Sequence, residues 1–130
     1  MAAIANPLRA TGTLKLILHL VSEDSIELVG DRYLAEEMIR YAEAFPSETA
    51  ATLLEAIASK MRIIKVEDRY VKICRGYIGT SDLSDIYHAA ACLQSDSFLI
   101  SDDGHFDRIR DEGIISVWGI HQAIRELLGI

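Results

Sequence analysis

The sequence contains little proline, no long uncharged apolar run and no repeat. Only two of its 130 residues are proline, half of the residues are apolar, and neither a low-complexity segment nor an internal repeat is found. This composition excludes a disordered or repetitive chain and is typical of a compact globular protein. We therefore predict a single domain over residues 1–130.

Cysteine motifs and membrane-spanning patterns are also absent. Cys74 and Cys92 lie in segments that predict helices, and no CxxC or Cys/His spacing indicates a zinc or cluster site. We expect both to be free, buried thiols. The longest apolar stretch near the start, residues 14–21, contains Lys15 and His19 and is too short for a membrane span or a secretory signal. We therefore expect a cytoplasmic protein that does not contact a membrane.

Positive charge is scarce as well, because 13 basic residues stand against 20 acidic ones and the net charge is −7. A protein that binds nucleic acid mainly through a basic surface is therefore disfavoured. The exception is a site where metal ions sit between clustered carboxylates and the phosphate, since the metals then carry the positive charge.

Apolar residues recur at helical and strand spacings in alternation along the chain. Helices are predicted over residues 11–23, from an Asp31 cap to Pro46, from a Ser47 cap through residue 57, around 71–78, across 86–93 and across 120–128, with a helical turn at 106–109. Strands are predicted at residues 25–29, 62–66, 97–101 and 114–117. This alternation predicts an α/β fold of three layers, α/β/α, with a mainly parallel central sheet.

Acidic residues gather at three places near the ends of these elements. In open parallel sheets, ligands bind outside the C-terminal ends of the strands. Hard cations such as Mg²⁺ and Mn²⁺ prefer carboxylate oxygens, and hydrolysis of a phosphodiester by metal-activated water needs several carboxylates from different elements. The candidates form three pairs, namely Glu36 and Glu37, Asp82 and Asp85, and Asp102 and Asp103.

Helical geometry separates the two glutamates of the first pair. At about 100° per residue, Glu36 points roughly 170° away from the apolar stripe of its helix, whereas Glu37 lies roughly 70° from that stripe. We therefore interpret Glu36 as a solvent-exposed partner of Arg40 in an i, i+4 pair. Glu37 borders the packed face, where a carboxylate needs a reason to lie, and it is the better site candidate.

Ordinary structural roles compete with a metal role at the other pairs. Asp82 can cap a helix and Asp85 can complement the helix dipole, so capping is the favoured interpretation from these residues alone. For Asp103, a turn or helix cap and a metal role are equally supported. His88 and His105 lie nearby in the sequence, but a role as proton carrier or ligand is the less favoured interpretation of both.

The segment 84–106, SDIYHAAACLQSDSFLISDDGHF, resembles the end of the PIN domain family of ribonucleases. The family pattern is an aspartate opening an alanine-rich helix, a short apolar strand, then Ser or Thr, any residue, and Asp. The match identifies Asp85 as the third family carboxylate, Ser101 as the hydroxyl residue and Asp103 as the fourth carboxylate. Upstream, YLAEEMIRY resembles the helix with the second acidic residue, which falls on Glu37. The similarity spans nearly the whole chain, including AAIANPL and the closing strand IISV.

The resemblance implies a metal-dependent endoribonuclease in which Glu37, Asp85 and Asp103 hold Mg²⁺ or Mn²⁺, with Ser101 and Asp82 in supporting roles. We expect the three carboxyl groups to converge in one acidic pocket, and like charge to raise at least one of their pKa values. RNA is the implied substrate. An inhibitory antitoxin protein, as in a toxin–antitoxin pair, and a second copy of the chain are the further partners to consider.

The sequence departs from the family pattern at its start. Family members begin with an apolar strand that ends in Asp, Ser or Thr, and Asn, whereas this sequence begins at Met1, beyond that strand in the match. Either the natural chain begins upstream, which we favour, or residues 1–5 are a remnant strand with Asn6 near the usual aspartate. Loss of the aspartate puts catalysis in doubt, so the alternative function is an inactive RNA-binding or protein-interaction module. An unfilled strand position would also leave backbone groups unpaired.

Overall fold

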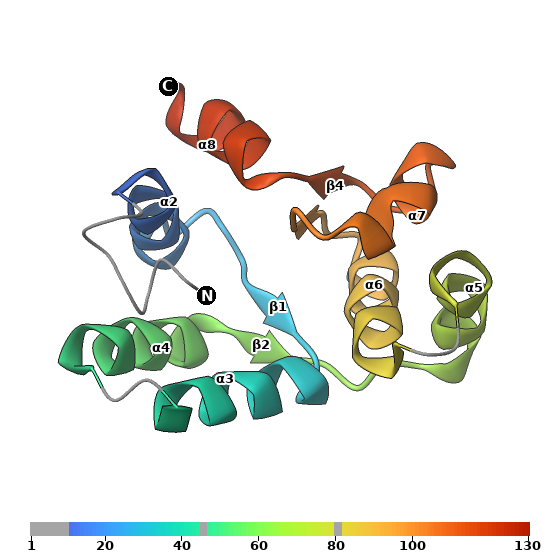
Figure 1. Cartoon of the computed structure of the whole chain (residues 1–130), viewed down its shortest axis with the longest axis horizontal. Coiled ribbons are helices and arrows are strands. Elements are labelled where there is room, and N and C mark those ends of the chain that lie inside the picture. Colours follow the sequence, from blue (N-terminus) through green and yellow to red (C-terminus); the bar gives the residue numbers. More distant parts are fainter. Residues whose placement is uncertain (1–10, 45–46, 80–81) are drawn as a thin grey trace.

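The computed structural model describes residues 11–44, 47–79 and 82–130, in which helices alternate with very short strands (Figure 1). In chain order the elements are α2 (Thr11–Ser22), β1 (Val29–Gly30), α3 (Arg32–Ala44), α4 (Glu48–Lys60), β2 (Arg62–Ile63), α5 (Asp68–Ile78), α6 (Leu83–Ser95), β3 (Leu99–Ile100), the 3₁₀ helix η1 (Gly104–Phe106), α7 (Asp107–Asp111), β4 (Val117–Trp118) and α8 (Ile120–Leu128). Each helix predicted from the sequence is present. The α/β class is therefore confirmed in this coarse sense.

The strands form two separate parallel pairs instead of one sheet. β1 pairs with β2, where Val29 lies opposite Arg62, and β3 pairs with β4, where Leu99 lies opposite Val117. Among the described residues no strand joins the two pairs. The single central sheet is therefore not observed, and the three-layer arrangement stays a prediction.

The strands are also shorter than the apolar patterns indicated. Residues 25–29 were expected to form a strand, but β1 begins only at Val29, and the expected strand 97–101 is reduced to Leu99 and Ile100. Among the residues that the structure describes, each of these strands pairs on one side only, and its apolar side chains are half-buried. Central parallel strands are buried on both faces and paired on both sides, and within residues 11–44, 47–79 and 82–130 no second neighbour extends β1 or β3.

Two hydrophobic clusters hold the helices together. The larger cluster centres on α6, whose Ile86, Ala89 and Ala90 are fully buried against α5, α7 and the residues around β4. The smaller cluster packs Met38 of α3 against Leu53 of α4. Because α6 also contacts α3 and β1, it connects the two clusters.

Both cysteines are free, as expected, but they differ in burial. Cys74 is buried in the larger cluster, whereas Cys92 is half-buried. Burial raises the pKa of Cys74 to about 11 and that of Cys92 to about 12, so both are neutral thiols near neutral pH. None of the described helices is long and apolar enough to cross a membrane.

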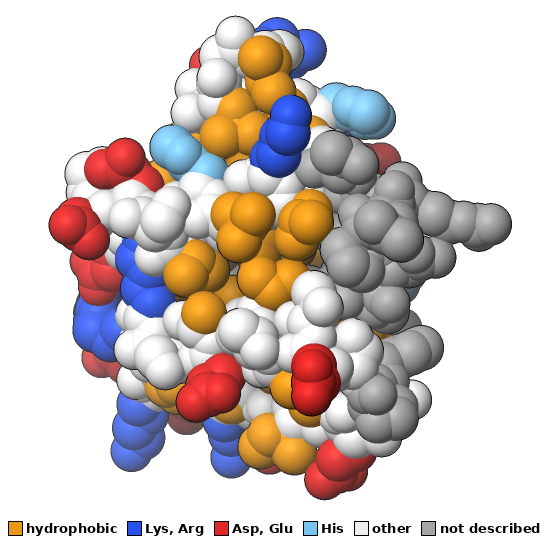
Figure 2. Space-filling view, turned by 90° about the vertical axis from the view of Figure 1, so that its left-hand side faces the viewer, with side chains coloured by type: hydrophobic (Ala, Val, Ile, Leu, Met, Phe, Trp, Pro, Cys, Tyr) orange, Lys and Arg blue, Asp and Glu red, His pale blue; other side chains and the backbone are white. Residues whose placement is uncertain are grey.

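Some hydrophobic side chains remain on the surface. Figure 2 shows a group of hydrophobic side chains on the side of the molecule where α2 and α4 lie. Leu18 of α2 is 48% exposed, and Ile39 of α3 is 61% exposed. Exposed apolar surface of this kind is a common feature of surfaces that contact another molecule.

Candidate functional site

A groove of about 850 Å³ lies between residues 25–29, which lead into and begin β1, and residues 96–101, which contain β3. Asp85, His88 and Cys92 of α6 line it as well. These three residues are spaced by three and four positions, so they share one face of the helix. The groove therefore follows α6 from its first turn to its last.

The three carboxylates predicted from the sequence all line this groove. Glu37 comes from α3, Asp85 from the first turn of α6 and Asp103 from the loop after β3. Ser101 also lines the groove, whereas Asp82 is not among its lining residues. The fold thus brings residues from three distant segments to one surface.

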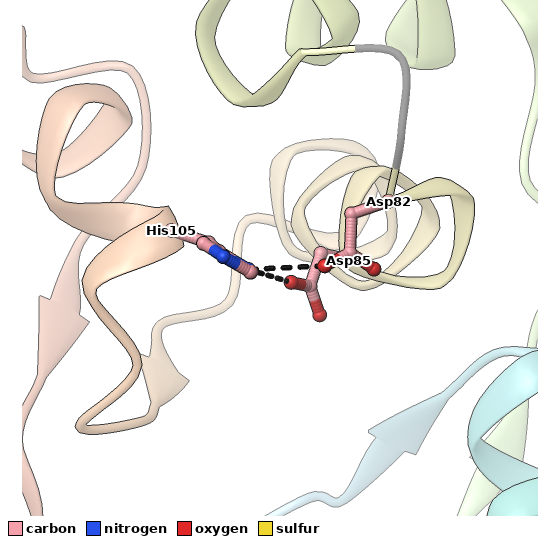
Figure 3. Close-up of side chains that lie close together, drawn as sticks. All are labelled: Asp82, Asp85 and His105. Atoms are coloured by element: carbon pink, nitrogen blue, oxygen red, sulfur yellow. Dashed lines mark hydrogen bonds and ion pairs between the residues drawn. The ribbon is translucent and has the colours of Figure 1, made fainter.

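The closest acidic contacts are made around His105, which follows Asp103. His105 Nδ1 lies 2.8 Å from Asp85 Oδ2, 3.0 Å from Asp82 Oδ2 and 3.5 Å from Asp103 Oδ1. Figure 3 shows the first two contacts, in which the imidazole points at two carboxylates from the start of α6. This arrangement places a group that can carry positive charge at the centre of three acids.

Asp82, Asp85 and His105 also form a group that can hold one cation. One ligand atom from each lies within 4.8 Å of the others. A cation with ligand distances of about 2.0 to 2.6 Å spans such a group. In the part of the chain that the structure describes, this tight group includes His105, whose ligand role the sequence disfavoured, and does not include Glu37 or Asp103.

The hydrogen bonds of Asp82, Asp103 and Ser101 show which of these residues cap a helix. Asp82 is the N-cap residue of α6, as expected, but its side chain makes no cap hydrogen bond; Ser81, the other cap candidate from the sequence, lies outside the described residues. Asp103 does act as a cap, because its Oδ1 accepts the N–H of His105 at 2.9 Å. Ser101 Oγ accepts the N–H of Asp103 at 3.1 Å. Asp103 therefore has both a local structural role and a place in the groove.

Burial is the main cause that raises the pKa of Asp85. The hydrogen bond from His105 lowers this pKa, whereas the hydrogen bond with Asp82 and the negative charges of Asp82 and Asp103 raise it further. The expected raised carboxyl pKa is thus confirmed at Asp85, although burial is a larger cause than like charge. The hydrogen bond to Asp85, and then the charge of Asp103, raise the pKa of His105. Because the pKa values of Asp85 and His105 are both raised, each shift favours the protonated form of its group in this hydrogen-bonded pair.

A second group, formed by Asp31, His88 and Glu37, lies one helical turn along α6. Asp31 is only 2% exposed; its Oδ1 accepts the N–H groups of Tyr33 and Leu34, and its Oδ2 lies 2.7 Å from His88 Nδ1. His88 Nε2 in turn lies 3.4 Å from Glu37 Oε1. Burial lowers the pKa of His88, but the hydrogen bond and charge of Asp31 and the charge of Glu37 outweigh burial and raise it.

The sequence interpretation therefore missed three participants. The sequence indicates only a capping role for Asp31, which it does perform, and a site role is the less favoured interpretation of His88 and His105. One signal was available, because Asp31 directly follows a strand, as the acidic pair after β3 does. Glu36 is exposed to solvent, as its helical position predicted.

Comparisons of the chain with protein-family models, with curated proteins and with solved structures found no match. No relative therefore indicates a role for Asp31, His88 or His105. A function for the chain can therefore be inferred only from the chemistry of the groove and from the sequence pattern in residues 84–106.

Proposed function

We propose that the groove is the active site of a PIN-type, metal-dependent endoribonuclease in which Glu37, Asp85 and Asp103 hold Mg²⁺ or Mn²⁺. The proposal is supported above all by one observation. These carboxylates, which the sequence pattern selects from three separate segments, line one groove near the C-terminal ends of β1 and β3. Metal-assisted hydrolysis of a phosphodiester needs such a convergence.

The charge of the groove explains why a cation is required. The described residues that line it include no Lys or Arg but six carboxylates, which are Glu27, Asp31, Glu37, Asp85, Asp96 and Asp103. Such a surface repels a phosphate group. A divalent cation supplies the positive charge that a phosphate needs and lowers the pKa of water, which is the chemistry of the proposed hydrolysis.

The donor set fits a divalent cation. The carboxylates of Asp82 and Asp85 and the imidazole of His105 lie close enough to share one ion, and Glu37 and Asp103 border the same groove. Carboxylate oxygens suit Mg²⁺ and Mn²⁺, and the imidazole suits Mn²⁺ better than Mg²⁺. His105 must give up its proton or turn aside to admit the ion, because it donates to Asp85 in this structure.

Neighbouring residues position the proposed ligands. His88 bridges the buried Asp31 and Glu37, which restricts the orientation of Glu37. Ser101 binds the backbone N–H of Asp103 and fixes the loop that carries it. Such restraint matters for rate, because a misplacement of about 1 Å can cost on the order of a hundredfold in catalysis.

The proposal extends to the finer architecture and to partners. In a three-layer PIN-like fold, the β1–β2 and β3–β4 pairs would belong to one mainly parallel sheet between two helical layers. RNA as substrate, an inhibitory antitoxin, a homodimer and a cytoplasmic location are supported by the sequence resemblance and composition alone. The apolar surface in Figure 2 offers an area for a protein contact.

One observation favours a second candidate function, a catalytically inactive PIN-like module that binds RNA or protein. His105 already contacts Asp82 and Asp85 within 3.0 Å, so a protonated imidazole can offset part of the negative charge of the cluster without a metal. Networks of this kind occur in proteins for structural reasons alone.

Cleavage of a short fluorescent single-stranded RNA tests the nuclease proposal. We expect Mn²⁺-dependent cleavage that is weak, because the resemblance implies a further acidic ligand upstream and residues 1–10 contain no Asp or Glu. Asp85→Asn should lower the rate by about a hundredfold or more. The matched control Asp102→Asn should stay within about twofold of the unaltered chain, because Asp102 is not among the groove residues. Equal cleavage by Asp85→Asn, or cleavage in EDTA, would refute the mechanism.

Metal binding is tested separately by thermal unfolding. A cation that binds only the native chain at a hundred times its dissociation constant stabilises it by about 2.7 kcal/mol. We therefore expect millimolar Mn²⁺ to raise the melting temperature of the unaltered chain and of Asp102→Asn, but not that of Asp85→Asn. RNA binding without a Mn²⁺ shift and without cleavage would favour the inactive module.

A further inference from the structure

A second pocket, of about 480 Å³, adjoins the acidic groove. Its lining comes from α6, from the starts of α3 and α5, and from residues 63–66, which end β2 and follow it. Asp31 lines both cavities, and the adjacent Tyr87 and His88 of α6 line the pocket and the groove respectively. The two cavities therefore share a wall at the Asp31–His88 contact.

An arginine and two tyrosines form a cluster on one side of this pocket. Arg32 and Tyr87 line the pocket, and Tyr33 packs beside them. The guanidinium carbon of Arg32 lies 5.0 Å from the ring centre of Tyr33 and 5.9 Å from that of Tyr87, and the two rings are 4.9 Å apart. Arg32 also donates to the Tyr33 hydroxyl at 3.1 Å. These contacts hold a guanidinium beside an aromatic surface, and both groups can stack on a further planar group.

The charge of this pocket differs from that of the groove. Arg32 and Lys65 line it, and within residues 11–44, 47–79 and 82–130 neither makes an ion pair with a carboxylate. Asp31 is only 2% exposed and binds His88 and the first amides of α3, whereas Asp68 adds one exposed carboxylate to the lining. Two cations therefore remain available for an anion, which the six carboxylates of the groove repel.

We propose that this pocket binds one nucleotide of single-stranded RNA next to the cleaved phosphodiester, with the base against Tyr87 and the phosphate at Arg32 and Lys65. The inference deepens the proposed function and rests on it, because the groove then takes the reacting phosphate and the pocket takes a neighbouring nucleotide. Bases stack on aromatic side chains and on guanidinium planes in proteins that bind single strands. The volume of about 480 Å³ lies within the range of small-ligand sites.

The lining favours a nucleotide over simpler ligands. Inorganic phosphate would engage Arg32 and Lys65 but would leave the ring of Tyr87 and the apolar side chains of Ile63 and Val66 uncovered. An apolar ligand would cover these side chains but leave both cations without a partner. A nucleotide supplies a planar base and a phosphate in one unit, so it matches both parts of the lining.

Binding of a defined RNA in EDTA tests the proposal without a contribution from metal or from cleavage. The probe is hexa-adenylate RNA with a 5′ fluorescein, titrated with the full chain at about 0.15 M salt and followed by fluorescence anisotropy. The matched probe has the same ribose-phosphate backbone but is abasic at every position. We expect hexa-adenylate to bind at least about fivefold more tightly than the abasic strand, as for the stacking of one base on an aromatic side chain.

Variants of Tyr87 test whether the ring stacks on the base. Tyr87→Leu should lower the affinity for hexa-adenylate by about fivefold or more and leave the affinity for the abasic strand unchanged. Tyr87→Phe keeps the ring and should retain most of the preference for hexa-adenylate. Circular dichroism of both variants checks that the fold is intact, so that a loss of binding in Tyr87→Leu alone reports the missing ring.

A matched pair of arginine variants tests the phosphate contact. Arg32→Gln should weaken binding of both probes and reduce the slope of log affinity against log salt by about 1. Arg75→Gln removes the same charge about 10 Å along α5 from Asp68, at a residue that lines neither the pocket nor the groove. Since salt screens exposed charges beyond about 8 Å, this control should stay within about twofold of the unaltered chain.

Several results would overturn the proposal. They are the absence of saturable binding, equal binding of the two probes, an undiminished preference for hexa-adenylate in Tyr87→Leu, and equal losses in Arg32→Gln and Arg75→Gln. Base-dependent binding through Tyr87 without Mn²⁺-dependent cleavage would support the pocket and reject the nuclease. Mn²⁺-dependent cleavage without base-dependent binding would support the nuclease and reject the pocket.

Discussion

Replacing Asp31 by alanine should destabilise the chain more than replacing it by asparagine, because Asp31 makes two separate structural contacts. One carboxylate oxygen caps α3 through the N–H groups of Tyr33 and Leu34, and the other binds His88 at 2.7 Å. The side chains of Asp31 and His88 are only 2% and 14% exposed, so water screens the second contact weakly.

The free-energy cost of losing each of the two contacts can be estimated separately. Loss of an N-cap costs about 1 kcal/mol, whereas asparagine caps as well as aspartate. Loss of a hydrogen bond to a charged partner costs about 1.5 to 3 kcal/mol. We therefore expect Asp31→Ala to lower the free energy of unfolding by about 3 kcal/mol and Asp31→Asn by about 1.5 kcal/mol, with Glu36→Gln, on the exposed face of α3, as a near-neutral control.

The histidine adds a pH dependence with a defined sign. The pKa of His88 is raised in the folded chain, so its contribution to stability is fully present below its unfolded value of about 6.5 and is lost as the pH rises through the folded value. The stability difference between the unaltered chain and Asp31→Asn should therefore shrink as the pH rises above about 6.5. His105 is present in both proteins, so its own titration cancels in this comparison.

Urea unfolding followed by circular dichroism in EDTA measures these differences, with the slope m used to check that the unfolded surface is unchanged. Equal losses for Asp31→Ala and Asp31→Asn would show that the cap contributes nothing. A loss below about 0.5 kcal/mol for Asp31→Ala, or a difference that grows with pH, would refute the assigned contact with His88.

Three further outcomes follow from local packing and burial. Ile109→Ala should lower the free energy of unfolding by roughly 2 to 5 kcal/mol in urea, because Ile109 is 0% exposed within the larger cluster; a loss below that range would place it outside the core. Asp102→Ala should cost about 1 kcal/mol in the same assay, since it removes the acceptor of the Ile120 N–H, and a cost equal to that of Asp102→Asn would contradict this. Cys74 and Cys92, with pKa values of about 11 and 12, should react slowly with a thiol reagent at neutral pH until urea unfolds the chain, and rapid native labelling would show that they are accessible thiolates.

The helices could be predicted because their signals are local. Ser47 caps α4 by accepting the N–H of Ala50, and the apolar stripe that follows it lies within a few turns. The strands depend on partners far along the chain, since Val29 pairs with Arg62 and Leu99 with Val117. An alternating pattern indicates which side chains prefer burial, but it does not show whether a second partner strand is present.

The same distinction applies to the candidate site. Glu37, Asp85 and Asp103 could be selected because the resemblance orders them along the sequence. Asp31 and His105 could not, because the first had a complete local explanation as a helix cap, and the second depends on a contact with Asp85 across 20 residues. When a residue such as Asp31 already has a local role as a helix cap, the sequence gives no sign of its second contact with a residue far along the chain.

The loop after β3 has a consequence for how the groove responds to a ligand. Asp102 binds the first amide of α8, while its neighbour Asp103 lines the groove, as expected of successive side chains in extended backbone. The α8 helix packs on α2 and contributes Leu127 to the same groove. Because Asp102 and Asp103 are adjacent, we expect a ligand that draws Asp103 inward to shift the start of α8 as well. The hydrogen-exchange rate of the Ile120 amide should therefore report whether a ligand occupies the groove. This amide lies outside the charged part of the groove.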